Sequence, residues 1–231
     1  MNQFLVINAS PRTKGTSAML AKRCENYLLQ QGKQVQLMHL YTHLHNFDQL
    51  YEAIQKADTI LLCGPCYINT YPADVIGLLE NLAKRKELLH GQNLYGIIQG
   101  GMPYVHTHQC GLLTLKAFAN TCNVTYKGGF VLGGGAMLDG KPVETLPNGR
   151  KVAKQLDIFF KIVEQGLNVP LELSEAVQLN IKGRLAQLLA FFMNRTIDRD
   201  LRHRGIDSKQ PNPYATGQLL QGEIMMSGKE G

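Results

Sequence analysis

Near its start the chain reads Ser10-Pro11-Arg12-Thr13-Lys14-Gly15-Thr16, and Ser17 follows directly. An apolar run at residues 4–7 precedes this stretch, and a helical pattern begins near Ser17. A strand, a loop and a helix in this order can hold a phosphate, because the helix N-terminus presents unpaired N–H groups and the positive end of its dipole. The hydroxyls, the two cations and the glycine add donors, charge and room for close approach.

We therefore interpret this loop as a phosphate site, with an ordinary strand-to-helix turn as the alternative. In the alternative, Thr16 or Ser17 only caps the helix. A Walker loop needs Gly-x4-Gly-Lys-Ser/Thr, and the dinucleotide fingerprint needs three glycines after the first strand. Gly15 is the one glycine of this stretch, which argues against a Rossmann domain built around NAD. Hydroxyls with few glycines suit a terminal phosphate monoester.

The composition is that of a globular protein that can bury a core. Of its 231 residues, 44% are hydrophobic, and no apolar run reaches the ~18 residues of a membrane span. The first residues lack the features of a secretion signal, and the five cysteines show no scaffold spacing. These features predict a cytoplasmic protein. The net charge of +6 favours anionic ligands, and we assign no nucleic-acid partner.

Strand-like and helical patterns alternate along the first two thirds of the chain. Short connections between them predict a doubly wound α/β protein with a five-stranded parallel sheet. The run at residues 59–63 is apolar throughout, as in a central strand. Gly32 and Gly166 are expected to end the first and last helices. Strands are expected at residues 4–9, 35–40, 59–63, 94–98 and 124–131, and helices at 17–31, 47–56, 72–85, 112–120 and 152–165.

Unusual loops also follow the third and fourth predicted strands. In an open parallel sheet, ligands bind beyond the carboxyl ends of the strands, where the strand order reverses. The second loop, residues 64–72, reads Gly-Pro-Cys-Tyr-Ile-Asn-Thr-Tyr-Pro, and the third loop, residues 99–104, reads Gln-Gly-Gly-Met-Pro-Tyr. We expect both loops to converge with the phosphate loop, residues 10–17, on one ligand.

The second loop has the composition of a site for a flat apolar ring. Tyr67, Ile68 and Tyr71 can stack on or flank such a ring, and backbone N–H groups with Asn69 can satisfy its polar edge. The paired glycines of the third loop let the backbone approach the other polar edge. Partial burial of the tyrosines in a loop core is the alternative. With the phosphate loop, these features predict a mononucleotide with a large planar heterocycle.

Residues 7–17 resemble the FMN phosphate loop of the NAD(P)H-dependent FMN reductase family, in the flavodoxin-like superfamily. Residues 64–73 are similar to the second flavin loop of that family. The resemblance extends over residues 1–166 and implies a flavodoxin-like sheet with strand order 2-1-3-4-5. It also implies that the phosphate is bound by Ser10, Arg12, Thr16 and Ser17, and that the isoalloxazine is flanked by Pro65, Cys66, Tyr67, Ile68 and Asn69 and closed off by Gly100 and Gly101.

The resemblance implies a flavoprotein oxidoreductase with FMN as cofactor. NADPH or NADH would supply the hydride, and a quinone, a nitro- or azo-aromatic or a free flavin would accept the reducing equivalents. No side-chain acid or base is required, so we assign no catalytic residue. Tyr104 and His106 are candidates for contact with the substrate. A homodimer or a higher homo-oligomer is expected.

Two other classes of function remain as alternatives. One is a flavodoxin-type electron carrier, although such carriers are usually acidic and this chain is basic. The other is a binding module that keeps the fold without flavin. Turnover of NADPH without a partner protein would separate an enzyme from a carrier.

Two short motifs favour plain structural roles. Cys63-Gly64-Pro65-Cys66 matches the thioredoxin tetrapeptide, but Cys63 ends a predicted buried strand instead of opening a helix, so dithiol chemistry is the weaker alternative. His106 and His108 are spaced as two possible metal ligands with Cys110 nearby. No carboxylate or second cysteine completes that set locally, so we assign no metal site.

The pattern changes after Gly166, and we expect an FMN-binding domain at residues 1–167 with a helical extension at 168–231. Residues 181–204 have an apolar stripe and a basic end, and residues 182–209 carry a net charge of +4. The stripe can pack on its own domain or on a second subunit. The basic end can bind the phosphates of NADPH, lie on an anionic membrane or simply be solvated. The tail from Ser208 is expected to be mobile or docked on another chain.

Overall fold

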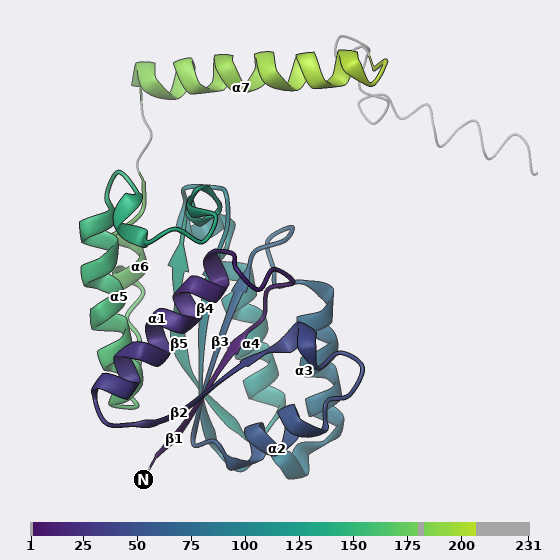
Figure 1. The fold of residues 1–231 in the computed structure, drawn as a ribbon, viewed down its shortest axis with the longest axis vertical. Coiled ribbons are helices and arrows are strands. Elements are labelled where there is room, and N and C mark those ends of the chain that lie inside the picture. Colours follow the sequence, from purple (N-terminus) through teal and green to yellow (C-terminus); the bar gives the residue numbers. More distant parts are fainter. Residues whose placement is uncertain (1, 180–182, 207–231) are drawn as a thin grey trace, which may run out of the picture. The chain divides into compact units, whose positions relative to one another are not determined.

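The computed structural model describes residues 2–179 and 183–206 (Figure 1). The chain divides into two compact units between residues 180 and 181. The first unit contains the sheet and the three loops that the sequence singles out, and the second contains one described helix.

Five strands form one parallel sheet in the order β2-β1-β3-β4-β5. This order confirms the flavodoxin-like topology. The chain runs from β1 to β2 on one side and then to β3 on the other side, so the strand order reverses next to β1. The crevice for a ligand is expected at that point, beyond the strand ends. The strands are β1 (Gln3–Asn8), β2 (Gln34–His39), β3 (Thr59–Pro65), β4 (Gln92–Gln99) and β5 (Val124–Leu132).

Burial of the strands follows their position in the sheet. Every residue of β3 is buried, because helices cover both faces of a central parallel strand. β2 lies at an edge, and its Gln34 and Gln36 are exposed whereas Met38 is buried. The apolar run of β3 and the mixed pattern of β2 in the sequence reflect these two environments.

Helices cover both faces of the sheet (Figure 1). Phe4 and Val6 of β1 join the core under α1 and α5, and the alternate residues Leu5 and Ile7 join the core under the other three helices. The helices are α1 (Thr16–Gln30) and α5 (Gly149–Glu164) on one face, and α2 (Asp48–Lys56), α3 (Ala73–Lys84) and α4 (Gln109–Thr121) on the other. Short 3-10 helices are η1 (Leu40–Thr42), η2 (Lys86–Leu88), η3 (Val105–Thr107), η4 (Gly135–Leu138) and η5 (Val143–Thr145).

Glycines end α1 and α5, as predicted. Gly32 follows α1 with φ +70°, a conformation that a side chain disfavours. The N–H of Lys33 then donates to the carbonyl of Leu28 at 3.0 Å, the bond of a helix-terminating Schellman motif. Gly166 has φ +69° after α5.

The segment after α5 covers the outer edge of β5. The N–H of Val169 donates to the carbonyl of Lys127 at 2.7 Å, and the N–H of Val131 donates to Ser174 Oγ at 2.9 Å. Ser174 lies in α6 (Glu172–Glu175). An exposed strand edge invites pairing with other chains, and these bonds close it. Val169 and Ser174 thus bond to the sheet, and the predicted end of the FMN-binding domain at 167 stays a prediction.

The second unit contains α7 (Gly183–His203), which lies within the helix predicted at residues 181–204. Its apolar side chains Phe191, Phe192 and Met193 are exposed. None of the helices within residues 2–179 and 183–206 has both the length and the apolar composition that crossing a bilayer requires. The predicted mobile or docked tail from Ser208 lies outside the described residues.

Ser174→Ala is expected to destabilise the protein by about 1–3 kcal/mol, because a buried N–H of β5 loses its acceptor. Urea unfolding followed by circular dichroism measures this. Thr145→Ala is the control, since Thr145 Oγ1 makes an exposed bond to the Pro142 carbonyl, and it should change stability by less than about 0.5 kcal/mol. Equal effects of the two variants would contradict the proposed role of Ser174.

Candidate functional site

The phosphate loop is shaped by its own polar side chains. Asn8, the last residue of β1, is fully buried, and its Oδ1 accepts the Ser10 N–H at 3.2 Å. The other end of its amide lies 2.7 Å from His39 Nδ1. Ser10 Oγ in turn accepts the Arg12 N–H at 3.2 Å. These bonds hold the backbone in a tight turn directly above the end of the strand.

The N-terminus of α1 has no side-chain cap. Gly15 occupies the N-cap position, no side chain caps the helix, and its first turn contains no acidic residue. The alternative in which Thr16 or Ser17 is only an N-cap is therefore not what the structure shows. Unpaired N–H groups and the dipole of a 15-residue helix favour a negative ligand here.

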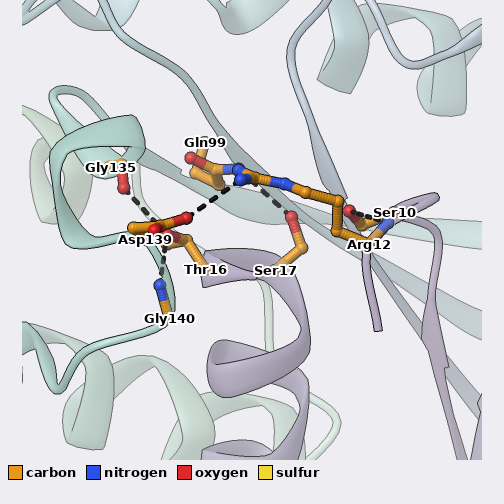
Figure 2. A network of polar contacts seen from close by, with 8 residues as sticks. All are labelled: Ser10, Arg12, Thr16, Ser17, Gln99, Gly135, Asp139 and Gly140. Carbon is orange, nitrogen blue, oxygen red and sulfur yellow. Dashed lines mark hydrogen bonds and ion pairs between the residues drawn. The ribbon is translucent and has the colours of Figure 1, made fainter. Parts of the chain in front are cut away.

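Two hydroxyls of the loop are already engaged within the protein (Figure 2). Thr16 Oγ1 donates to the Gly135 carbonyl at 2.9 Å and accepts the Gly140 N–H at 3.4 Å. Ser17 is 1% exposed, and its Oγ accepts a bond from Gln99 Nε2 at 3.2 Å. Thr16 thus connects the phosphate loop to the segment after β5, and its predicted contact with a phosphate stays a prediction.

Arg12 meets an acidic partner that the sequence analysis did not include. Arg12 Nη1 lies 2.9 Å from Asp139 Oδ1, and the two side chains are 62% and 72% exposed (Figure 2). The guanidinium folds back over the helix start, since a Cβ added at Gly15 would lie 3.4 Å from Arg12 Nε. Asp139 belongs to the fourth loop, residues 133–140, and has φ +46°.

The second loop projects an apolar tip from the sheet edge. The N–H of Tyr67 donates to the Thr70 carbonyl at 2.7 Å, which closes a tight turn. Ile68 and Asn69 at its tip have φ +50° and +68°, and Ile68 is 99% exposed. Positive φ is unfavourable for a β-branched residue, and such strain is concentrated at binding sites. Tyr67, Ile68 and Asn69 are therefore presented to solvent, where a ring could contact them.

Tyr71 was expected to flank a ring, and this expectation is wrong. Its side chain is 1% exposed, and its hydroxyl donates to the Ile97 carbonyl at 3.2 Å. The ring fills the space left by Gly64, where an added Cβ would lie 2.8 Å from it. Tyr71 thus belongs to the core beneath the loop, and burial raises its pKa well above the usual range.

Gln99 joins three of the loops. Its carbonyl accepts the Cys66 N–H at 2.7 Å, and its side chain donates to Ser17. Gln99 is 5% exposed, and its Oε1 is buried with no partner in the described part of the chain. The half-buried Cys66 and the buried Pro65 precede the turn of the second loop. These bonds fix the spacing between the phosphate loop and the second loop.

A buried histidine fixes the third loop. His108 is 3% exposed, and its Nε2 donates to the Met102 carbonyl at 2.8 Å. Its ring packs closely against Gly100, where an added Cβ would lie 2.4 Å from His108 Cε1. The fourth loop adds a second support, because the Gly134 N–H donates to the same carbonyl at 2.9 Å. Within the third loop, Gly100 is buried and Gly101 is exposed.

The two candidate substrate residues form one aromatic face. The rings of Tyr104 and His106 stack with centroids 5.6 Å apart and planes 17° apart. His106 is exposed and Tyr104 is half-buried. Tyr104 ends the third loop and His106 follows it, so the pair can contact a planar molecule near that loop.

Cys63 and Cys66 lie in environments that raise the pKa of their thiols. Burial raises the pKa of Cys63, whose Sγ donates to the Ser17 carbonyl at 3.2 Å. Burial also raises the pKa of Cys66, against a smaller lowering by the Asn69 N–H. A thiolate is the reactive form in dithiol exchange, so neither cysteine is prepared for it. Among residues 2–179 and 183–206, no three His, Cys, Asp or Glu side chains gather to hold a metal ion.

Asn8, Gln99, His108 and Asp139 support the site, and the sequence analysis assigned none of them. Asn8 ends β1 directly after its apolar run at residues 4–7, and Gln99 ends β4 after the apolar run at residues 94–98. A polar residue at the carboxyl end of a buried strand is a signal that could have identified both. No local pattern marks Asp139, because its partner Arg12 lies 127 positions away in the sequence.

The strand order defines a flavodoxin-like fold, and its first helix begins without a side-chain cap or an acidic residue in its first turn. Residues 3–108 match the family model of the NADPH-dependent FMN reductases. The predicted resemblance to this family is thereby confirmed, and the match spans the phosphate loop and the second and third loops. It supports a flavin-dependent oxidoreductase in general terms. A search of curated proteins finds no match to the sequence.

Solved structures share the fold at low sequence identity. An NADH:FMN oxidoreductase in its apo form is 18% identical, with 78% of this chain and 95% of that chain covered and a TM-score of 0.57. General stress protein 14 of Treponema denticola, in complex with FMN, is 13% identical, with coverages of 73% and 100% and a TM-score of 0.52. An NADPH-quinone reductase of P. pentosaceus is 16% identical, with coverages of 74% and 100% and a TM-score of 0.52.

Gly100→Ala is expected to destabilise the protein by about 1–3 kcal/mol, because the new methyl group overlaps the fixed His108 ring. Gly101→Ala is the matched control, since its Cβ would meet only Ala136 at 3.8 Å, and it should stay within about 0.5 kcal/mol of the wild type. Urea unfolding of the two variants measures the difference. A stable Gly100→Ala protein would show that His108 does not fix the third loop.

Proposed function

We propose that this protein is an FMN-dependent NAD(P)H oxidoreductase that reduces a small planar acceptor. The observation that carries the proposal is the uncapped, acid-free N-terminus of α1 beneath Ser10 and Arg12. It lies within the residues that match the FMN reductase family. A phosphate monoester suits this donor set, because N–H groups, a hydroxyl and a guanidinium all favour a dianion.

The other loops supply what the rest of FMN requires. Tyr67 and Ile68 offer exposed apolar and aromatic surface for the isoalloxazine, with the Asn69 amide beside them. The backbone at Gly100 and Gly101, held by His108, can approach the polar edge of the ring closely. Ser17, Pro65 and Cys66 complete the surface between these loops.

FMN, when bound, supplies the chemistry by accepting a hydride from NADPH or NADH and passing reducing equivalents onward. The protein's part is to bind and orient the flavin and to leave one ring face accessible. The stacked Tyr104 and His106 would position a quinone, a nitro- or azo-aromatic or a second flavin near that face. We assign no side chain to proton abstraction.

Purified protein mixed with FMN is expected to retain a yellow chromophore through gel filtration. It should then oxidise NADPH or NADH with a quinone present and no partner protein. Retention of FMN without such turnover would favour a flavodoxin-type carrier. A protein that stays colourless after incubation with FMN would overturn the proposal in favour of a flavin-free module.

Ser10→Ala with Arg12→Ala should weaken FMN binding by at least about 10-fold, because charge-assisted bonds to the phosphate are lost. Binding of riboflavin, which has the same ring without the phosphate, should change little. Flavin fluorescence titration measures both. Arg150→Ala, which removes an exposed cation of α5, is the control and should leave both affinities unchanged. Equal losses for FMN and riboflavin would place the phosphate elsewhere.

Tyr104→Ala should raise KM for a quinone about 2- to 10-fold, since stacking of one aromatic ring contributes roughly 0.5–1.5 kcal/mol. FMN affinity should stay at the wild-type value, because the loss concerns only the acceptor. Tyr104→Phe keeps the ring and should restore KM. Steady-state kinetics at several quinone concentrations, together with an FMN titration, provide the measurement. An unchanged KM in Tyr104→Ala would remove this residue from the acceptor site.

A further inference from the structure

The Asp139 carboxylate is held above the N-terminus of α1 by the fourth loop. Two hydrogen bonds of Thr16 fix this loop on either side of Asp139. Thr16 Oγ1 donates to the Gly135 carbonyl and accepts the N–H of Gly140. Gly140 approaches the phosphate loop so closely that an added Cβ would lie 2.2 Å from the Lys14 carbonyl. These contacts bring Asp139 to Arg12 although neither side chain is buried (Figure 2).

This arrangement places an internal anion where the anion of a ligand is expected. A carboxylate near a helix N-terminus is favourable, and α1 has no acidic residue of its own in the first turn. Asp139 Oδ1 engages Nη1 of Arg12 at 2.9 Å, a donor that the proposed phosphate site also needs. An ion pair that is more than half exposed is weak, so a dianionic phosphate can displace the carboxylate.

We propose that Asp139 competes with the 5′-phosphate of FMN for Arg12 and so limits flavin affinity. The proposal rests on the FMN binding proposed above. Bound phosphate must either share Arg12 with a like-charged neighbour or move the carboxylate away, and both lower the affinity. Asp139 therefore favours release of FMN, as suits a flavin that exchanges during turnover more than one that stays permanently bound.

Asp139→Asn tests this with little risk to folding. Asparagine tolerates the φ of +46° at this position as well as aspartate does, and the side chain is exposed. The matched control is Asp157→Asn on α5. Asp157 also pairs with an arginine, since its Oδ1 lies 3.4 Å from Arg23 Nη2, and it is 55% exposed. This control removes one negative charge, as Asp139→Asn does, but at a position outside the phosphate loop and the fourth loop.

Full-length protein freed of flavin is titrated with FMN and with riboflavin, and FMN release is followed by stopped-flow fluorescence. Asp139→Asn should bind FMN about 3- to 10-fold more tightly and release it more slowly, a range that follows from the strength of exposed ion pairs and of charge repulsion. Riboflavin binding should not change, and Asp157→Asn should match the wild type for both ligands. In an Arg12→Ala background, the gain in FMN affinity from Asp139→Asn, expressed as the logarithm of the ratio of Kd values, should fall to less than half.

The outcomes separate this inference from the proposed function. FMN binding by the wild type with no gain in Asp139→Asn overturns the competition alone. An equal gain for riboflavin, or an undiminished gain in the Arg12→Ala background, also overturns it, because the effect would then not act through Arg12 and the phosphate. Absence of FMN binding in the wild type overturns the proposed function, and the inference falls with it.

Discussion

The direction of α1 is the constraint on which the candidate site depends. Leu20, Cys24 and Leu28 bury one face of the helix against the sheet, and the Cys63 thiol on β3 donates to the carbonyl of Ser17 in its first turn. The open N-terminus is thereby fixed at the carboxyl edge of a parallel sheet. The second, third and fourth loops emerge at that same edge, so a phosphate anchored there would bring a ligand within reach of each of them.

The sheet and its helices were predictable because their signals are local. Five strand-like patterns marked the strands, and the fully apolar run at residues 59–63 identified the central one. Gly32 ended the first helix in the expected conformation. The strand order came from the family resemblance, which rests on the motifs of three short loops. A helix or strand that is stabilised by burial of one face, or ended by one turn residue, leaves a pattern that can be read from neighbouring residues in the sequence.

The support of the site was less predictable because it comes from distant contacts. Tyr71 lies in a loop in the sequence, where an aromatic ring could equally face a ligand. In the structure, glycines at positions 64 and 96 leave a space that its ring fills. The polar residues around His108 in the sequence do not indicate that it is buried. Its burial follows from its contact with Gly100 and its hydrogen bond to the Met102 carbonyl. Such pairs depend on which segments meet after folding, which no window of neighbouring residues contains.

The two edges of the sheet differ in a way that bears on how copies of this chain can associate. On the β5 side, the bonds of Val169 and Ser174 use the N–H and carbonyl groups that a neighbouring strand would need. On the β2 side, exposed glutamines line the strand, and polar side chains make pairing with another sheet less favourable. A continuous sheet across two copies is thus disfavoured at β5 by the protein's own chain. We therefore expect copies of this chain to associate on that side through helices or loops, and the sheet to end at β5 within each copy.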